Sequence, residues 1–198
     1  MIDMEPISAI IQAGGQSRRM GTDKALIEYQ GRPILAHVID TLRQLSDEVI
    51  VVANRSDVYG PIVTPLGARL VPDYDPPSGP LGGIAAGLIA MRYELAIVVA
   101  CDMPLLNLDL LRYLIERAVD CDVVVPLTGD QPEPLHAVYR RACLPAIQQR
   151  LADNQRRVIS FFDDVRVALI PEAEWRVFDP AGRSLSNLNT PADLTLLA

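Results

Sequence analysis

The sequence has little positive charge and few aromatic residues, and the shortage of positive charge excludes one class of partner. The 198 residues include 18 Lys and Arg against 25 Asp and Glu, and the net charge is −7 at pH 7. Aromatic residues make up 5% of the chain. A negative field repels phosphate backbones, so we expect no nucleic-acid partner. Any anionic ligand therefore requires a local basic site.

Cysteine and long apolar runs are also scarce. The three cysteines, Cys101, Cys121 and Cys143, match neither a C-x-x-C redox pair nor a zinc-ligand pattern. We expect reduced and mostly buried thiols. No run approaches the roughly 20 apolar residues of a membrane span, and residues 1–5 carry acids where a signal peptide carries bases. These absences predict a cytoplasmic protein without membrane association.

The chain does contain many apolar residues, 49% of the total, in short runs that alternate with helical repeats. The pattern predicts strands at 7–13, 49–53, 70–71, 95–101, 122–126, 135–139 and 165–170, and helices at 34–42, 81–91, 108–119, 144–151 and 191–197. Strands that are apolar on both faces, separated by amphipathic helices, favour an α/β fold. We expect a Rossmann-like, mostly parallel sheet with helices on both faces, in a single domain spanning 1–198.

The first predicted strand ends in a glycine loop that carries positive charge. Gly14 and Gly15 let backbone N–H groups approach an anion, and Arg18, Arg19 and Lys24 follow. Lys24 is the only lysine of the chain, and its compact ammonium suits phosphate oxygens. Because ligands of open parallel sheets bind where strands end, the loop predicts a phosphate site. The alternative is an ordinary glycine turn with solvated arginines.

Two better-known phosphate loops do not match this segment. A dinucleotide fingerprint would need glycines at Gln16 and Arg19, and a P-loop would need Gly-Lys-Ser/Thr where residues 21–23 read Gly-Thr-Asp. The sequence therefore predicts neither hydride transfer nor P-loop chemistry.

A carboxylate follows the most apolar predicted strand. Asp102 comes directly after this strand, on the edge of the sheet where ligands bind. Mg²⁺ prefers oxygen ligands and is commonly held by one or two carboxylates together with substrate phosphates. We therefore expect Asp102 to bind Mg²⁺, the alternative being a turn cap before Pro104. The two histidines, His37 and His136, are expected to have packing or surface roles.

Several segments together resemble the signature of molybdenum cofactor guanylyltransferases, which are nucleotidyltransferases with a Rossmann-like fold. The matching segments are 12–21 with Asp23-Lys24, Gly-Arg-Pro-Ile at 31–34, Gly-Pro-Leu-Gly-Gly at 79–83, Cys-Asp-Met-Pro at 101–104 and Asn-Leu-Asn-Thr-Pro at 187–191. They occur in family order over nearly the whole chain. Gln12 departs from the family pattern, which usually has leucine there.

The resemblance implies transfer of GMP from GTP to the terminal phosphate of molybdenum-loaded molybdopterin, with pyrophosphate as leaving group and Mg²⁺ as cofactor. Molybdoenzymes or their chaperones are the further partners implied. The implied nucleotide-binding residues are Gln12, Ala13, Gly14, Gly15, Arg19, Lys24, Asp73 and Asp102. Of these, Lys24, Asp102 and Arg19 are implied in catalysis. Asn187, Asn189 and Arg156 are implied on the pterin side of the site.

Simpler roles exist for some of these residues. Asp73 fits a turn former, Asn189 a helix cap, and Arg156 one half of a solvated arginine pair. The rival functions are a molybdopterin cytidylyltransferase, a sugar-1-phosphate nucleotidyltransferase, and a noncatalytic nucleotide- or pterin-binding partner of molybdoenzymes. The presence of both Lys24 and Asp102 argues against the noncatalytic alternative.

Overall fold

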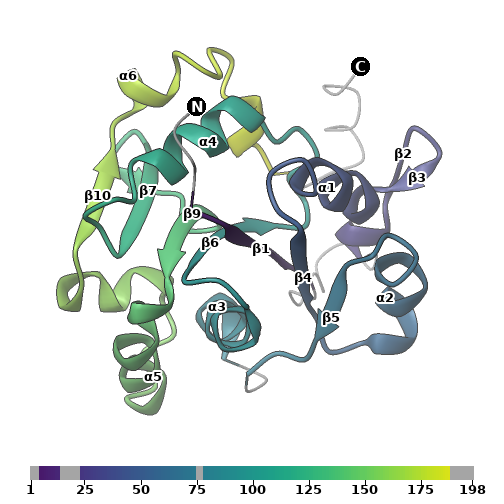
Figure 1. Cartoon of the computed structure of the whole chain (residues 1–198), viewed down its shortest axis with the longest axis horizontal. Helices are drawn as coiled ribbons and strands as arrows, with labels where there is room; N and C mark the ends of the chain where they lie inside the picture. The colour runs from purple at the N-terminus through teal and green to yellow at the C-terminus, as the bar shows by residue number, and fades with distance from the viewer. Residues whose placement is uncertain (1–4, 14–22, 75–77, 188–198) are drawn as a thin grey trace.

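The computed structural model describes residues 5–13, 23–74 and 78–187 and contains one large mixed sheet (Figure 1). Its strands are β1 (Ile7–Gln12), β4 (Glu48–Val52), β5 (Arg69–Val71), β6 (Leu95–Ala100), β7 (Val123–Thr128), β8 (Gln131–Pro132), β9 (His136–Arg140) and β10 (Val167–Ile170). The strand order is β10-β7-β9-β6-β1-β4-β5, and β8 pairs with β7. A separate hairpin joins β2 (Glu28–Tyr29) to β3 (Arg32–Pro33).

Most strand pairs in the sheet are parallel. β1 pairs in parallel with both β4 and β6, β4 with β5, and β10 with β7. β9 is antiparallel to both of its neighbours, β6 and β7. As a consequence β9 begins at the same edge of the sheet where the parallel strands end.

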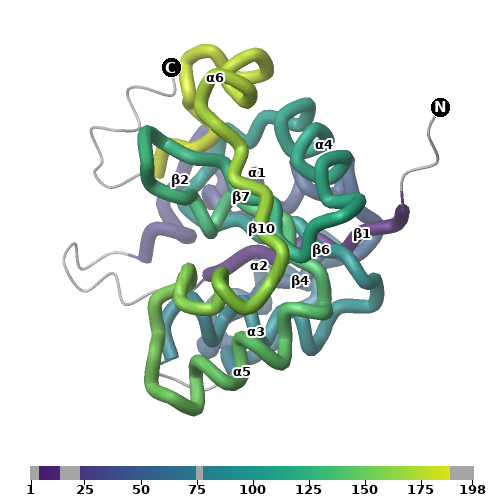
Figure 2. Tube along the Cα trace, turned by 90° about the vertical axis from the view of Figure 1, so that its left-hand side faces the viewer, coloured from purple at the N-terminus to yellow at the C-terminus, as the bar shows by residue number. Residues whose placement is uncertain are grey.

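Helices cover both faces of the sheet. On one face lie α1 (Ile34–Leu42), α2 (Ser56–Val63), α4 (Leu108–Glu116) and α6 (Glu172–Trp175), and on the other α3 (Gly79–Ala90) and α5 (Leu144–Ala152). Four short 3₁₀ helices, η1 (Lys24–Leu26), η2 (Arg141–Cys143), η3 (Val158–Asp164) and η4 (Arg183–Leu185), complete the described elements. Figure 2, turned by 90°, shows α3 and α5 together on the side opposite α4.

The central strands are buried on both faces because successive side chains alternate between them. In β1, Ala9 and Ile11 pack into the core beneath α1 and α4, whereas Ile10 packs into the core beneath α3. Small residues let α3 approach the sheet closely: a Cβ placed on Gly87 would lie 2.5 Å from Cγ2 of Ile10. Gly87 therefore serves the packing of this helix against β1.

The α/β, mostly parallel fold with helices on both faces is confirmed, and most predicted elements lie within a few residues of their observed bounds. The prediction missed α2, because Gly60 and Pro61 stand inside it. It also missed the β2–β3 hairpin, η3 and α6. The predicted closing helix at 191–197 lies outside the described residues. None of the described helices combines the length and hydrophobicity needed to cross a bilayer.

Candidate functional site

Backbone hydrogen bonds that continue past the strand ends hold one edge of the sheet in register. Cys101 N donates to Gln12 O at 3.0 Å, which joins the ends of β6 and β1. Ala13 N donates to Val52 O at 3.0 Å, and Ala53 N donates to Val71 O at 2.9 Å. These hydrogen bonds hold the carboxyl ends of β1, β4, β5 and β6 together, and we refer to this edge of the sheet as the strand-end platform. The loops that follow these strands start from it.

Lys24 and Asp102 meet at this edge. The Lys24 Nζ lies 3.0 Å from Asp102 Oδ2, and the two side chains are 20% and 16% exposed. Asp102 is placed by the end of β6 and Lys24 by η1. Because both side chains are partly exposed, a ligand can still reach them. Partial burial also removes some of the surrounding water, which strengthens the electrostatic interactions of the ammonium and the carboxylate. The expected convergence of these two residues is present.

Helix α2 positions Lys24 through Asp23. The Asp23 carboxylate accepts a hydrogen bond from Ala25 N at 3.2 Å and so caps η1. The same carboxylate accepts a hydrogen bond from the Tyr59 hydroxyl at 2.5 Å and pairs with Arg55. Burial, together with the hydrogen bond to Asp23, raises the pKa of Tyr59, so the phenol stays protonated as a donor. Neither Tyr59 nor Arg55 is among the site residues predicted from the sequence.

The side chain of Gln12 joins β1 to α3. Its Nε2 donates to Pro80 O at 2.8 Å, and a Cβ added to Gly83 would lie 3.0 Å from the Gln12 amide. The usual leucine of the resembled family could not make the hydrogen bond to Pro80 O. Gln12 thus fixes the first turn of α3 against the end of β1.

Asp73 lies at the same edge, after β5. Its backbone N donates to Asn54 Oδ1 at 2.9 Å, and its carboxylate accepts from Tyr74 N at 2.7 Å. These contacts are those of a turn residue. The carboxylate also lies beside Gly82 of α3, where an added Cβ would be 3.1 Å from Asp73 Oδ1. The nucleoside-side role of Asp73 stays a prediction.

A cavity of about 260 Å³ lies beside Asp102. Its walls come from the end of β6, the start of α3, the β8–β9 connection, η3 and the chain after η4. The residues that line it are Pro80, Ala100, Asp102, Met103, Glu133, Pro134, Leu135, Val158 and Asn187. Most of these are apolar, and three carry polar side chains. Ligand sites commonly have this composition, with a few polar groups that orient the ligand.

Glu133 is the polar lining residue that the sequence analysis missed. It stands between Pro132 and Pro134 in the connection from β8 to β9. Burial raises the pKa of its carboxyl, and a side-chain hydrogen bond with Thr128 partly opposes this shift. The signal available in the sequence was an acidic residue between two prolines, immediately before a predicted strand.

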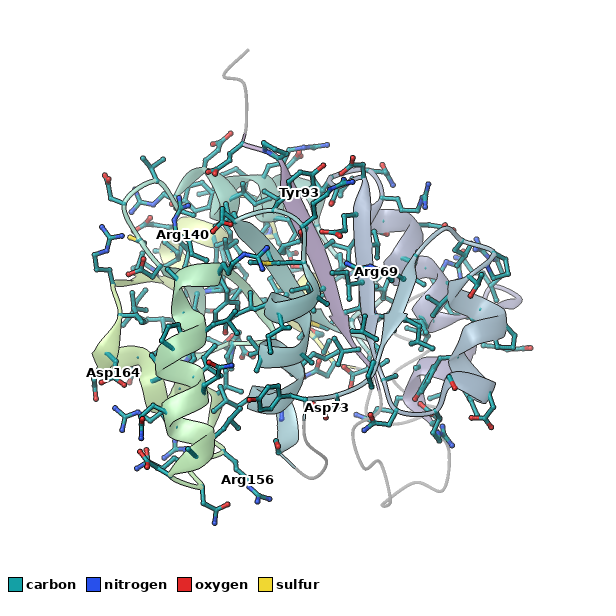
Figure 3. All side chains as sticks on the ribbon, turned by 60° about the horizontal axis from the view of Figure 1, so that its bottom comes forward. Arg69, Asp73, Tyr93, Arg140, Arg156 and Asp164 are labelled. Atoms are coloured by element: carbon teal, nitrogen blue, oxygen red, sulfur yellow. The ribbon has the colours of Figure 1, made fainter. Side chains whose placement is uncertain are left out.

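The expected pterin-side residues are not all brought together. Asn187 lines the cavity. Arg156 is exposed and does not line it, but it lies at the same end of the molecule as Asp73, opposite Tyr93 and Arg140 (Figure 3). Asn189 lies outside the described residues, as do Gly14, Gly15 and Arg19 of the glycine loop. Their roles, and those of Ala13 and Arg156, stay predictions.

The histidines pack within the fold. His37 Nε2 lies 2.8 Å from Tyr29 O, and its ring meets the Tyr29 ring edge-on. His136 is fully buried. Burial lowers its pKa to about 4, against a smaller raising effect of Asp179. All three cysteines are unpaired, and burial raises the pKa of Cys101, with the neighbouring Asp102 charge adding to the shift. The Cys101 thiol is therefore not a nucleophile at neutral pH.

The donor set fits a metal ion that arrives with a phosphate ligand. Within residues 5–13, 23–74 and 78–187, no three His, Cys, Asp or Glu side chains are grouped as a metal site. Mg²⁺ commonly takes one or two protein carboxylates and completes its shell with phosphates and water. Asp102, at a strand end and only 16% exposed, fits as such a single carboxylate.

Comparison with known proteins connects this arrangement to one family. A family model described as the MobA-like NTP transferase domain matches residues 9–167. A probable molybdenum cofactor guanylyltransferase from Pelotomaculum thermopropionicum is 38% identical over 94% of this chain and 89% of its own. A molybdenum cofactor guanylyltransferase from Desulfosudis oleivorans is 36% identical over 96% of this chain and 94% of its own.

Solved structures agree at the level of the fold. The crystal structure of molybdopterin-guanine dinucleotide biosynthesis protein A from Archaeoglobus fulgidus has a TM-score of 0.82 at 24% identity and covers 96% of both chains. The 2-C-methyl-D-erythritol 4-phosphate cytidylyltransferase from Thermus thermophilus has a TM-score of 0.71 at 18% identity, covering 98% of this chain and 96% of its own. The second structure shows that a cytidylyltransferase also has this fold.

Proposed function

Because the chain belongs to the MobA-like NTP transferase family, we propose that it transfers GMP from GTP to the terminal phosphate of molybdenum-loaded molybdopterin. Pyrophosphate is the leaving group. The observation that carries this proposal is the Lys24–Asp102 pair, 3.0 Å apart, with a cavity of about 260 Å³ on the Asp102 side. Relatives named as molybdenum cofactor guanylyltransferases, which match nearly the full chain, support the choice of substrates.

In this reaction an oxygen of the acceptor phosphate forms a bond to the α-phosphorus of GTP while the bond to the pyrophosphate oxygen breaks. The acceptor is already an anion, so no protein base has to remove a proton from it. Lys24 would offset negative charge that builds on the phosphates, as a fixed ammonium does in phosphoryl transfer. Arg19 and the backbone of Gly14 and Gly15 are proposed to hold the same phosphates.

Asp102 is proposed to bind Mg²⁺ together with the GTP phosphates. When bound, this ion would neutralise phosphate charge and help to orient the reacting groups. The Asp102 carboxylate has a second role that needs no metal, since it fixes the Lys24 ammonium at 3.0 Å. The pair therefore positions a cation at the strand-end platform before the nucleotide arrives.

The nucleoside of GTP is proposed to lie over the ends of β1 and β5, near Gln12, Ala13 and Asp73. This leaves the cavity between β6 and β9 for the second substrate. Molybdoenzymes or their chaperones are the proposed receivers of the product. Unpaired cysteines are compatible with a reducing compartment, and we propose a cytoplasmic location.

The test is a pyrophosphate-release assay with the purified protein, Mg²⁺, molybdenum-loaded molybdopterin and GTP, CTP or ATP in parallel reactions. We expect release with GTP that depends on both the pterin and Mg²⁺. Faster release with CTP would assign the chain as a cytidylyltransferase. Binding of GTP with no release in the presence of the pterin would favour the noncatalytic alternative.

A further inference from the structure

The β8–β9 connection brings a second carboxylate to the cavity beside the Lys24–Asp102 pair. Both Glu133 and Asp102 line this cavity. Asp102 is paired with Lys24, whereas no lysine or arginine among the described residues forms an ion pair with Glu133. The two carboxylates therefore differ in what they can bind. Asp102 belongs to the phosphate and metal side of the site, and Glu133 has acceptor capacity left for an uncharged donor group.

The walls around Glu133 suit a flat heterocycle. Pro80, Met103, Pro134, Leu135 and Val158 contribute apolar surface, which can cover the two faces of a ring. The cavity volume of about 260 Å³ is just below the ~300–1,000 Å³ typical of sites that enclose a complete drug-sized ligand. It therefore has room for one ring system, and a nucleotide would extend well beyond it.

A pterin ring presents two donors side by side on one edge, a ring N–H and the exocyclic 2-amino group. A carboxylate accepts from such a pair with its two oxygens, as it does from a guanidinium group. On this basis, and resting on the proposed function, we infer that Glu133 recognises the amino edge of the pterin and so selects the acceptor substrate. Burial of Glu133 adds to the selectivity, because an analogue that lacks the donors leaves a half-buried carboxylate unsatisfied.

Guanine carries the same pair of donors, so the position of the cavity decides between the two rings. The cavity lies between the end of β6 and the start of β9, whereas the glycine loop follows β1, and β4 and β5 lie beyond β1. Asp102, the partner of Lys24, is among the residues that line the cavity. With the phosphates at Lys24 and Asp102, the two substrates occupy opposite sides of the pair, and the cavity falls on the acceptor side.

The test compares pterin with lumazine, which carries a carbonyl oxygen in place of the 2-amino group. Binding of each compound is measured through its own fluorescence for the wild-type protein, Glu133→Gln and Asp130→Asn. Asp130 is the matched control, since it is an exposed carboxylate in the neighbouring turn from β7 to β8 and does not line the cavity. We expect the wild type and Asp130→Asn to bind pterin about 10-fold to 100-fold more tightly than lumazine, and Glu133→Gln to lose this preference.

Several outcomes would overturn the inference: no pterin binding by the wild type at millimolar concentration, equal binding of the two compounds, or a preference that survives in Glu133→Gln. A loss of the preference for GTP over ITP in Glu133→Gln would move the residue to the guanine site. Glu133→Asp, which keeps the charge on a shorter side chain, is expected to retain part of the pterin preference even if Glu133→Gln folds poorly. Failure of the proposed function would appear separately, as no GTP-dependent pyrophosphate release by the wild type.

Discussion

At the scale of single residues, the most informative contact joins two side chains that are 78 positions apart in the sequence. Lys24 is the first residue of η1, which comes after β1 in the chain, and Asp102 lies two residues past the end of β6. β1 and β6 are parallel neighbours, so their carboxyl ends meet at one edge. Once the alternation of strands and helices is recognised, this convergence can be predicted without any knowledge of side-chain contacts.

We expect Lys24→Ala and Asp102→Ala each to lower turnover by on the order of 100-fold or more. Lys24→Ala removes the cation that offsets phosphate charge, and Asp102→Ala removes both the proposed metal carboxylate and the group that orients Lys24. The measurement is the steady-state rate of GTP-dependent pyrophosphate release, with thermal unfolding to check that each variant is folded.

The exposed ion pair between Arg32 and Asp40 is a matched control. Its nitrogen and oxygen lie 2.8 Å apart, but the side chains are 46% and 43% exposed. Exposed pairs of this kind contribute about 0–1 kcal/mol to stability, and neither residue lines the cavity beside Asp102. Arg32→Ala and Asp40→Ala should keep wild-type turnover, and full activity in Lys24→Ala or Asp102→Ala would remove that residue from the mechanism.

Glu133 could not be predicted as a site residue from the alternation of strands and helices. The predicted phosphate and metal ligands follow parallel strands, whereas Glu133 precedes β9, which is antiparallel to β6. Reversal of one strand brings its beginning to the edge where the others end. The direction of β9 depends on pairing between distant segments, and the local hydrophobic pattern does not predict this pairing.

At the scale of elements, the strands and the amphipathic helices could be predicted because their burial follows simple periods. Helix α2 could not, since Gly60 and Pro61 are both poor helix formers and the segment reads as a loop. Packing outweighs this local preference, with Tyr59 and Val63 fully buried against the rest of the core. The missed helix matters for the site, because its Tyr59 and its N-cap residue Arg55 both bind Asp23, the residue that caps η1.

The contact between α3 and β1 leads to a prediction about packing. Gly87→Ala should destabilise the protein, because the added methyl group would lie 2.5 Å from Ile10 Cγ2 in a closely packed core, and overpacking of this kind costs about 1–3 kcal/mol. Alanine normally gains about 1 kcal/mol over glycine inside a helix, so we expect a net loss of up to about 2 kcal/mol. The free energy of unfolding from denaturant titration measures the difference.

A double variant separates this close contact from other effects of the substitution. Ile10→Ala removes the atoms that the new methyl group would meet, although it costs stability by itself. We expect Gly87→Ala combined with Ile10→Ala to be more stable than the sum of the two single losses implies. Additive losses would mean that the strain at Gly87 has another source.

At the scale of the whole molecule, β9 connects the two parts of the sheet. It pairs with β6 on one side and β7 on the other, and both cores include residues from it. A change that destabilises β9 is therefore expected to destabilise the chain as one unit, in line with the predicted single domain 1–198. Trp175, the only tryptophan, is buried against β7 and reports on this region by fluorescence.

His136 makes this unit sensitive to acid. It is fully buried in β9, and within the described part of the chain neither of its ring nitrogens has a hydrogen-bond partner. Burial lowers its pKa from 6.5 to about 4. Between these two values the unfolded chain binds a proton that the folded chain does not, so stability is present above pH 6.5 and falls as the pH drops toward 4. At 1.36 kcal/mol per pKa unit, the loss between pH 7 and pH 5 should be about 2 kcal/mol.

The variant His136→Leu isolates this contribution, since leucine fills a similar volume and cannot take up a proton. Relative to the wild type, its free energy of unfolding should change about 2 kcal/mol less between pH 7 and pH 5. Carboxyl groups that both proteins share, such as Glu133, cancel in this comparison. The raised pKa of Glu133 by itself makes the folded state more stable as the pH falls, which opposes the effect of His136. Unfolding is followed by Trp175 fluorescence and by far-ultraviolet circular dichroism, and the two transitions should coincide if β9 couples both cores. Parallel pH dependences in the wild type and His136→Leu would show that the buried imidazole does not set the acid sensitivity.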